Sequence, residues 1–380
     1  MLGVADSFAA KGFTTVAIDA AKHGDRSFCT SGQATIQGIP QCTGAGVQCQ
    51  TQLPAGAQGD ANPPGTCAAG QDFIRRPVSP ACQSNPGTCS YTPGPGIPVV
   101  SSNYLVSANF FRTRDTFRQD IIDQSQLVRA VTALSSPTLP NPLFEYMKTQ
   151  GVIVDPQQVY FVGQSLGAVQ GTVDVATNPR ISRAVLNVGG GTVVDIFTTS
   201  PAFATTTNAL LASLGIQPGA NSAYLQFLVV AKTILDPADP VNFAGHLQQS
   251  STLPNLLGAQ FDDGTGHQRP KPTLTQAAFC DQVVPNPWNY ILDSTAGTGP
   301  MPGLPLFPSA HATFELFMTG APTAGALASC PTPTSTSANA IPHGFFTNWS
   351  AATGQGQADA ATFLGDPTNS ANLPPSVRSF

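Results

Sequence analysis

The order of apolar and polar positions along the chain predicts two kinds of element. Short apolar runs bounded by turn residues predict buried strands at 13–19, 157–162, 181–188, 272–279 and 313–318. Apolar residues at helical spacing predict helices at 111–134, through most of 192–246 and at 357–364. Strands that alternate with helices are typical of an α/β protein, in which helices cover both faces of a mostly parallel sheet.

The first residues of the chain also have a helical pattern. Apolar side chains at positions 2, 4, 5, 8 and 9 form a stripe, and Gly12 suits the left-handed end of a helix. The chain therefore begins as if inside a folded domain. We expect the natural sequence to continue upstream of Met1, with the first strands of the sheet and a signal peptide.

Composition narrows the classes of partner. Only 10% of the 380 residues are charged, 41% are hydrophobic and the net charge is −5, which favours a folded core over a disordered chain. Lys and Arg form no cluster, so we expect no nucleic-acid partner. Apolar runs fall short of the roughly 18 residues that a membrane span needs, and we expect no transmembrane segment. The oligomeric state is left open.

The cysteines indicate an oxidising compartment. Six of the eight lie in a stretch rich in Gly, Pro and Thr, which cannot bury much apolar surface and which we interpret as a disulfide-stapled insertion at 27–100. Zinc binding is the less favoured interpretation, because these cysteines are farther apart in the sequence than the paired ligands of zinc sites. We expect a secreted or periplasmic protein. The six are Cys29, Cys42, Cys49, Cys67, Cys82 and Cys89, with pairing left open, and Cys280 and Cys330 remain as a fourth pair by elimination.

One motif carries chemistry. The sequence VYFVGQSLGA at 159–168 places G-x-S-x-G between a predicted strand and a predicted helix that begins at about Leu166. Glycines on both sides of Ser165 permit a sharp turn that presents its hydroxyl above a helix N-terminus. The backbone N–H of Leu166 can then donate to an oxyanion. The alternative is a structural serine in a tight turn.

With this motif the chain resembles the α/β-hydrolase superfamily, in particular secreted bacterial esterases and lipases. In that family the acid and the histidine follow the nucleophile in this order, each after a late strand. The segment CDQVVP at 280–285 resembles the family's acid turn, and IPHGFF at 341–346 resembles its histidine loop. The resemblance implies Ser165 as nucleophile, Asp281 as acid and His343 as base.

Other residues compete for these roles. His311 lies before the last predicted strand and His23 lies in a His-Gly turn, so we favour His343 as the base. Asp239 is the rival acid, but aspartates flanked by prolines more often shape turns. Asp262 and Asp263 lie in a polar Gly-rich loop, and we interpret them as solvated residues.

The resemblance also implies a domain plan. Residues 1–191 and 267–380 would form the hydrolase core, and the apolar helical segment 192–266 would form a lid or cap. The second oxyanion donor of this family comes from a loop before the first helix, and no residue of this chain fills that role.

We therefore predict a serine hydrolase that cleaves carboxylic esters, including aliphatic polyesters, without a cofactor or metal. The apolar content of the lid suits an acyl pocket. Two alternatives remain: an acyltransferase or peptidase with the same triad, and a non-catalytic secreted binding module that uses the cysteine-rich insertion.

Overall fold

The computed structural model describes residues 2–18, 28–29, 34–36, 39–41, 49–50, 110–133, 141–152, 154–248, 253–297, 312–320, 330, 332–334, 336–348 and 350–380. The chain divides into two compact units, one of residues 1–16 with 124–380 and one of residues 17–123. Most of the predicted insertion at 27–100 lies outside the described residues, and its disulfides stay a prediction.

The smaller unit contains two short antiparallel pairs. Strand β1 (Phe28–Cys29) pairs with β4 (Cys49–Gln50), and β2 (Ala34–Ile36) pairs with β3 (Ile39–Gln41). Helix α4 (Phe110–Thr132) begins in this unit and ends in the larger one, and it confirms the helix predicted at 111–134.

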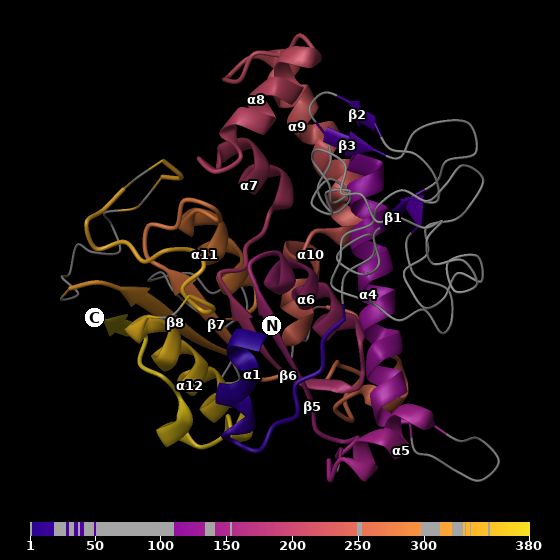
Figure 1. The fold of residues 1–380 in the computed structure, drawn as a ribbon. Coiled ribbons are helices and arrows are strands. Elements are labelled where there is room, and N and C mark those ends of the chain that lie inside the picture. Colours follow the sequence, from indigo (N-terminus) through magenta and orange to yellow (C-terminus); the bar gives the residue numbers. More distant parts are fainter. Residues whose placement is uncertain are drawn as a thin grey trace, which may run out of the picture. The chain divides into compact units, whose positions relative to one another are not determined.

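The larger unit is built on a five-stranded sheet in which every pairing is parallel (Figure 1). Four of its strands confirm the predicted ones to within two residues, so the α/β class is confirmed. The fifth, at the sheet edge, is too short to leave a pattern in the sequence. In spatial order the strands are β5 (Val159–Gln164), β6 (Ile181–Asn187), β7 (Thr273–Ala278), β8 (Ala312–Met318) and β9 (Val377–Ser379).

The strand predicted at 13–19 is wrong. Residues 13–18 have no ladder partner among the described residues, and Asp19 lies outside them. Phe13 is half-buried, with its ring 6.0 Å from that of Phe8 and 5.8 Å from that of Tyr160. Val16 is 43% exposed, so the apolar run is anchored at one end only and does not form a buried strand.

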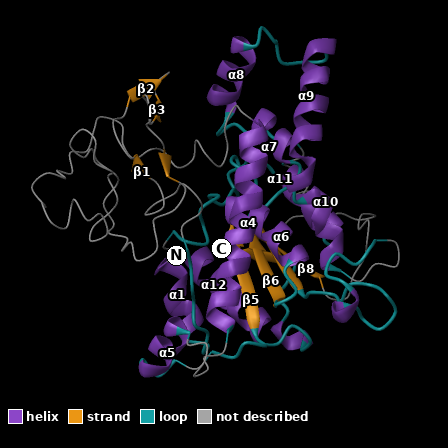
Figure 2. Cartoon of the chain, turned by 90° about the vertical axis from the view of Figure 1, so that its right-hand side faces the viewer, coloured by secondary structure: helices purple, strands orange, loops and turns teal. Residues whose placement is uncertain are grey.

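Helices lie on both faces of the sheet (Figure 2). The stripe at the start of the chain is confirmed as a helix, and Gly12 after it has a φ of +83°. The helical prediction for 192–246 is confirmed, whereas α5 and α11 were not predicted and the final helix is longer than expected. The bounds are α1 (Leu2–Ala9), α5 (Pro142–Thr149), α6 (Leu166–Thr177), α7 (Val193–Thr199), α8 (Ala204–Ser213), α9 (Ser222–Leu235), α10 (Val241–Ala244), α11 (Asn286–Thr295) and α12 (Ala351–Gly365).

Two apolar clusters fix these helices to the sheet. On one face, α1 and α12 pack against side chains that include Val185 and Phe317. On the other face, α6, α10 and α11 pack against Ala184 and Leu186. Neighbouring residues of β6 thus belong to opposite faces, as strand geometry requires. Burial on both faces explains why the strands read as continuous apolar runs rather than alternating ones.

Helix α6 is held at its C-terminal end by two buried side chains. Lys271 Nζ donates to the carbonyl oxygens of Val175 and Asn178, and Gln268 Nε2 donates to that of Ala176 at 3.0 Å. A cation at this end complements the negative pole of the helix dipole. Burial lowers the pKa of Lys271 to about 7.

A row of polar side chains crosses the sheet on the α12 face. The parallel register aligns Gln164, Asn187, Gln276 and Glu315 on four successive strands. Asn187 Nδ2 donates to Gln276 Oε1 at 3.1 Å, and Gln276 Nε2 donates to Glu315 Oε2 at 2.8 Å. Arg378 on β9 completes the row by donating to Glu315 Oε1 at 3.1 Å. The fully buried carboxyl of Glu315 therefore accepts from one donor on each neighbouring strand.

The structure brings the last two cysteines together. Cys280 and Cys330 form a disulfide, with their Cα atoms 5.4 Å apart, and both are buried beside β7 and β8. Within the described part of the chain, no helix is both long and apolar enough to cross a membrane.

Stability should fall as the pH rises, because of Glu315. Burial, with Asp359 nearby, raises its pKa from 4.5 to about 9. The folded state then binds this proton more tightly than the unfolded state, so the contribution of Glu315 to the free energy of unfolding decreases between about pH 4.5 and 9. Glu315→Gln should flatten this decrease in urea unfolding measured across that range. The exposed Glu145→Gln is the matched control, and an equal slope in both variants would contradict the assignment.

Candidate active site

Ser165 stands at the turn between β5 and α6. Its φ of 56° and ψ of −120° are a strained combination that a non-glycine residue adopts only when its surroundings enforce it. The backbone N–H of Ser165 donates to the carbonyl of Asn187 on β6 at 2.8 Å, which fixes the turn to the sheet. Residues held in such conformations cluster at functional sites.

The two glycines of the motif have different tasks. A Cβ on Gly163 would lie 2.3 Å from the carbonyl oxygen of Gly167, so this position requires glycine for the close approach of strand and helix. Gly171 has a similar task, because a Cβ there would lie 2.0 Å from the ring of Phe161. A Cβ on Gly167, in contrast, would meet nothing within 4 Å outside the local helix backbone, which leaves open space beside Ser165.

His343 is presented by a short loop that two aromatic side chains anchor. Phe345 and Phe346 are each 1% exposed and belong to the apolar cluster under α12. The ring of Phe345 lies 4.5 Å from that of Phe317 on β8. The loop begins at Ile341, whose backbone N–H donates to the carbonyl of Phe279 at 3.2 Å. The imidazole is therefore carried on a rigid base next to the end of β7.

Asp281 lies in the turn that follows β7. Its Oδ1 accepts from the backbone N–H of Val283 at 2.8 Å and of Val284 at 3.1 Å. These bonds occupy one carboxylate oxygen and turn the other, Oδ2, toward the histidine loop. The Asp281 side chain is 0% exposed, so its charge depends on these partners.

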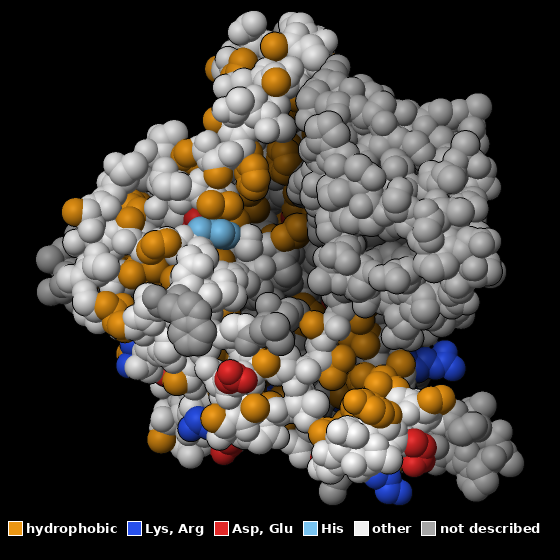
Figure 3. Space-filling view, viewed as in Figure 1, with side chains coloured by type: hydrophobic (Ala, Val, Ile, Leu, Met, Phe, Trp, Pro, Cys, Tyr) orange, Lys and Arg blue, Asp and Glu red, His pale blue; other side chains and the backbone are white. Residues whose placement is uncertain are grey.

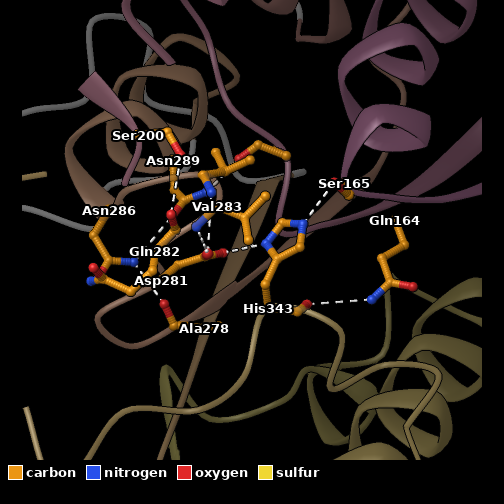
Figure 4. A network of polar contacts seen from close by, with 12 residues as sticks. Gln164, Ser165, Ser200, Ala278, Asp281, Gln282, Val283, Asn286, Asn289 and His343 are labelled. Carbon is orange, nitrogen blue, oxygen red and sulfur yellow. Dashed lines mark hydrogen bonds and ion pairs between the residues drawn. The ribbon is translucent and has the colours of Figure 1, made fainter. Parts of the chain in front are cut away.

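The three side chains form a continuous relay (Figure 4). His343 Nε2 lies 2.7 Å from Ser165 Oγ, and His343 Nδ1 lies 2.6 Å from Asp281 Oδ2. With a carboxylate at Nδ1, the proton of neutral imidazole resides on that nitrogen, and Nε2 is free to accept the serine proton. The residues come from three loops at the carboxyl edge of the sheet, where parallel α/β sheets hold their ligands.

The relay is partly open to solvent. The His343 side chain is 15% exposed, so a reagent can reach it while the carboxylate behind it stays dry. Figure 3 shows a histidine side chain exposed on this face, with hydrophobic side chains near it.

The rival acid has a structural setting. Asp239 Oδ2 accepts from the backbone N–H of Val193 at 2.7 Å, and its Oδ1 accepts from that of Val241 at 3.2 Å. It therefore holds the first residue of α7 against the start of α10. Burial raises the pKa of Asp239 to about 6, and the two N–H donors oppose that rise.

The two remaining acidic rivals take no part in the relay. Asp262 and Asp263 accept from backbone N–H groups of their own loop, at Gly264 and Thr265. His311 and His23 lie outside the described residues. Of the residues that the sequence offered for a triad, the structure brings together Ser165, His343 and Asp281.

Sequence reasoning missed the side chains that hold the relay from behind. Gln164 Nε2 donates to the backbone carbonyl of His343 at 3.4 Å, and Asn286 and Asn289 lie behind the acid turn (Figure 4). The only signal for these residues in the sequence is their position next to the motifs. Gln164 precedes the serine directly, and the asparagines begin the helix after the VVP segment.

Among the described residues, no group of three or more His, Cys, Asp or Glu side chains could hold a metal ion. No protein-family model matches the chain, and no curated protein matches it in a sequence search.

Proposed function

We propose that this protein is a serine hydrolase that cleaves carboxylic esters and has the α/β-hydrolase fold. The observation that carries the proposal is the relay from Ser165 Oγ through His343 to Asp281, with both contacts under 3 Å. A serine hydroxyl is a weak nucleophile at neutral pH and needs an adjacent base that a third group orients. The disulfide between Cys280 and Cys330 also suits our expectation of an oxidising, extracytoplasmic compartment.

The chemistry follows from the positions of the three groups. His343 Nε2 takes the proton as Ser165 Oγ bonds to the ester carbonyl carbon, and the carbonyl electrons move to oxygen. Collapse of this intermediate breaks the bond to the alcohol, which leaves with the proton from His343, and an acyl-serine remains. Water, deprotonated by the same imidazole, then attacks the acyl carbon. Collapse of this second intermediate breaks the bond to Ser165 Oγ and releases the acid, and His343 returns the proton to Ser165 Oγ.

The oxyanion would be held at the N-terminus of α6. The backbone N–H groups of Leu166 and Gly167 belong to the first turn of the helix, which has no intrahelical acceptor for them. Of these, Leu166 follows the nucleophile directly and is our candidate donor. A donor of this kind is worth about 10²–10³ in rate.

Residues 192–266 are proposed to form the lid. Its first helix is tied to the acid turn, because Ser200 Oγ donates to the carbonyl of Gln282 at 3.0 Å. It is also tied to α11, because Trp288 Nε1 donates to Thr199 Oγ1 at 2.8 Å. An ion pair of 2.6 Å between Lys232 and Asp195 links α9 to α7.

The surface of this lid favours an apolar ester. Residues 196–231 contain no charged side chain, and α9 exposes Leu225, Val229 and Val230 by 54–65%. Apolar side chains exposed in a group mark a binding surface more often than chance. We propose esters with medium-length or longer acyl chains, including aliphatic polyesters, as substrates.

Ser165→Ala should reduce hydrolysis of p-nitrophenyl esters by about 10⁶-fold, because the nucleophile is removed. A fluorophosphonate should label Ser165 of the wild-type protein, as peptide mass spectrometry can show. Ser213→Ala, at an exposed helix end, is the control and should keep full activity. Equal activity of wild type and Ser165→Ala would refute the serine mechanism.

Mutations of the two candidate acids should have different effects, one on kcat and one on stability. Asp281→Asn should lower kcat about 10⁴-fold through loss of the correct imidazole tautomer. Asp239→Asn should keep kcat but lose about 1–3 kcal/mol of stability, because an amide oxygen can replace only one of the two accepting oxygens. Kinetics combined with urea unfolding measures both effects. A large loss of kcat in Asp239→Asn alone would reverse the assignment.

A charge on the lid should affect only water-insoluble esters. Val229→Lys should lower kcat/KM for a dispersed long-chain ester several-fold while it leaves that for p-nitrophenyl acetate unchanged, because only the former needs the apolar surface. Gln226→Lys adds the same charge to the same helix without loss of an apolar side chain. Similar losses in both variants on the dispersed ester would show that charge alone, not the apolar surface, is responsible.

A further inference from the structure

We propose that Asn286 and Asn289 are positioning residues that hold the acid turn against the loop after β6, so that Asp281 meets His343. This inference rests on the proposed function. Neither residue hydrogen-bonds to the relay. Asn286 acts through the backbone of the turn, and Asn289 acts through Asn286 and the loop after β6. Both are almost completely buried, at 2% and 1% exposure.

Asn286 uses its whole side-chain amide to define the acid turn. Its Oδ1 accepts from the backbone N–H of Cys280 at 2.7 Å, and its Nδ2 donates to the carbonyl of Ala278 at 2.7 Å and to Asn289 Oδ1 at 3.0 Å. One side chain therefore joins the last residue of β7 to the residue that precedes Asp281. Figure 4 shows this amide behind the acid, on the side away from His343.

The turn needs such a tether because its backbone is strained. Cys280 has a φ of 55°, in the left-handed region that costs a non-glycine residue about 1 kcal/mol or more. Its conformation sets the direction in which the Asp281 side chain leaves the chain. Two independent links hold Cys280: the amide of Asn286 at its N–H and the disulfide to Cys330 at its side chain.

Asn289 links Asn286 to the loop after β6, which packs against the helix of the nucleophile. Its Nδ2 donates to the carbonyl of Gly189 at 2.5 Å, in the triglycine segment 189–191 that follows β6. A Cβ on Gly189 would lie 2.8 Å from the Cβ of Ala168, three residues after Ser165. A Cβ on Gly190 would lie 2.6 Å from Val284, three residues after Asp281.

The triglycine segment is thus a thin spacer between the nucleophile helix and the acid turn. The asparagine pair fastens the acid turn to this spacer by hydrogen bonds, which are directional. Without the pair, the carboxylate is free to shift relative to the imidazole. A displacement of about 1 Å far from the reacting atoms can cost about 10²-fold in rate.

A double-mutant cycle tests the assignment. Asn286→Ala in the wild-type protein should lower kcat for p-nitrophenyl butyrate about 10²-fold, with little change in KM. In the Asp281→Asn background the same change should have less than about a threefold effect, because the carboxylate that it positions is gone. Equal losses in both backgrounds would overturn the positioning role.

The matched control is Asn178→Ala. Asn178 is also buried, at 4% exposure, and its side chain hydrogen-bonds to Ser125 and to the backbone N–H of Arg180 near the start of β6, at the opposite edge of the sheet. It should lose stability in urea unfolding while kcat stays unchanged. A comparable loss of kcat in the control would show that Asn286→Ala acts through general destabilisation and not through the position of Asp281.

A spectroscopic readout is independent of turnover. In wild type, NMR should show a low-field proton signal from the His343 Nδ1–H bond to Asp281, which disappears in His343→Ala. Asn289→Ala, which removes the link to the spacer and the acceptor of one Asn286 N–H, should shift or broaden this signal, and so should Asn286→Ala. An unchanged signal in folded variants would overturn the proposal.

The same set separates two kinds of failure. If Ser165 is not labelled and no ester is cleaved, the proposed function fails, and the NMR signal still reports whether the asparagines position the acid. If Asn286→Ala does not fold, Asn289→Ala passes through the same cycle and gives the same two outcomes.

Discussion

The carboxyl ends of β5 and β7 lie at one edge of the sheet because every described pairing in it is parallel. This constraint brings Ser165 and Asp281 close together across a gap that β6 and its glycines fill. The third member of the relay, His343, then needs only a short loop anchored on the same edge. The serine elbow, the acid turn and the spacer between them all depend on a fixed register of three strands.

Backbone strain in this protein is concentrated where that register ends. Ser165, Val188 and Cys280 are the non-glycine residues with positive φ in the described chain, and each follows the end of a strand, β5, β6 or β7. Surrounding contacts stabilise these conformations. The backbone N–H groups of Ser165 and Val188 donate to β6 and β7, and Cys280 is held by the hydrogen bond to Asn286 and by its disulfide. Strain and its compensation thus lie together at the proposed site.

The sequence predicted those parts of the fold that depend on local pattern. Four buried strands, the helix after Ser165 and the helices of 192–246 follow from apolar runs, and the order of Ser165, Asp281 and His343 follows from motifs. The strand at 13–19 was wrong because an apolar run does not reveal whether a neighbouring strand exists to pair with it. Gln164 was missed because its partner is a backbone carbonyl 179 residues away, and Asn286 was missed because its bonds depend on how the chain turns back after β7, which no local pattern encodes.

The polar row across the sheet has a consequence for how the chain reaches its native state. Side chains alternate between the faces of a strand, so a slip of β8 by one residue would move Glu315 to the opposite face. Its carboxyl would then leave Gln276 and Arg378 and enter an apolar layer, at a cost that a purely hydrophobic strand would not incur. The row therefore favours the native register of the sheet over pairings that are shifted by one residue.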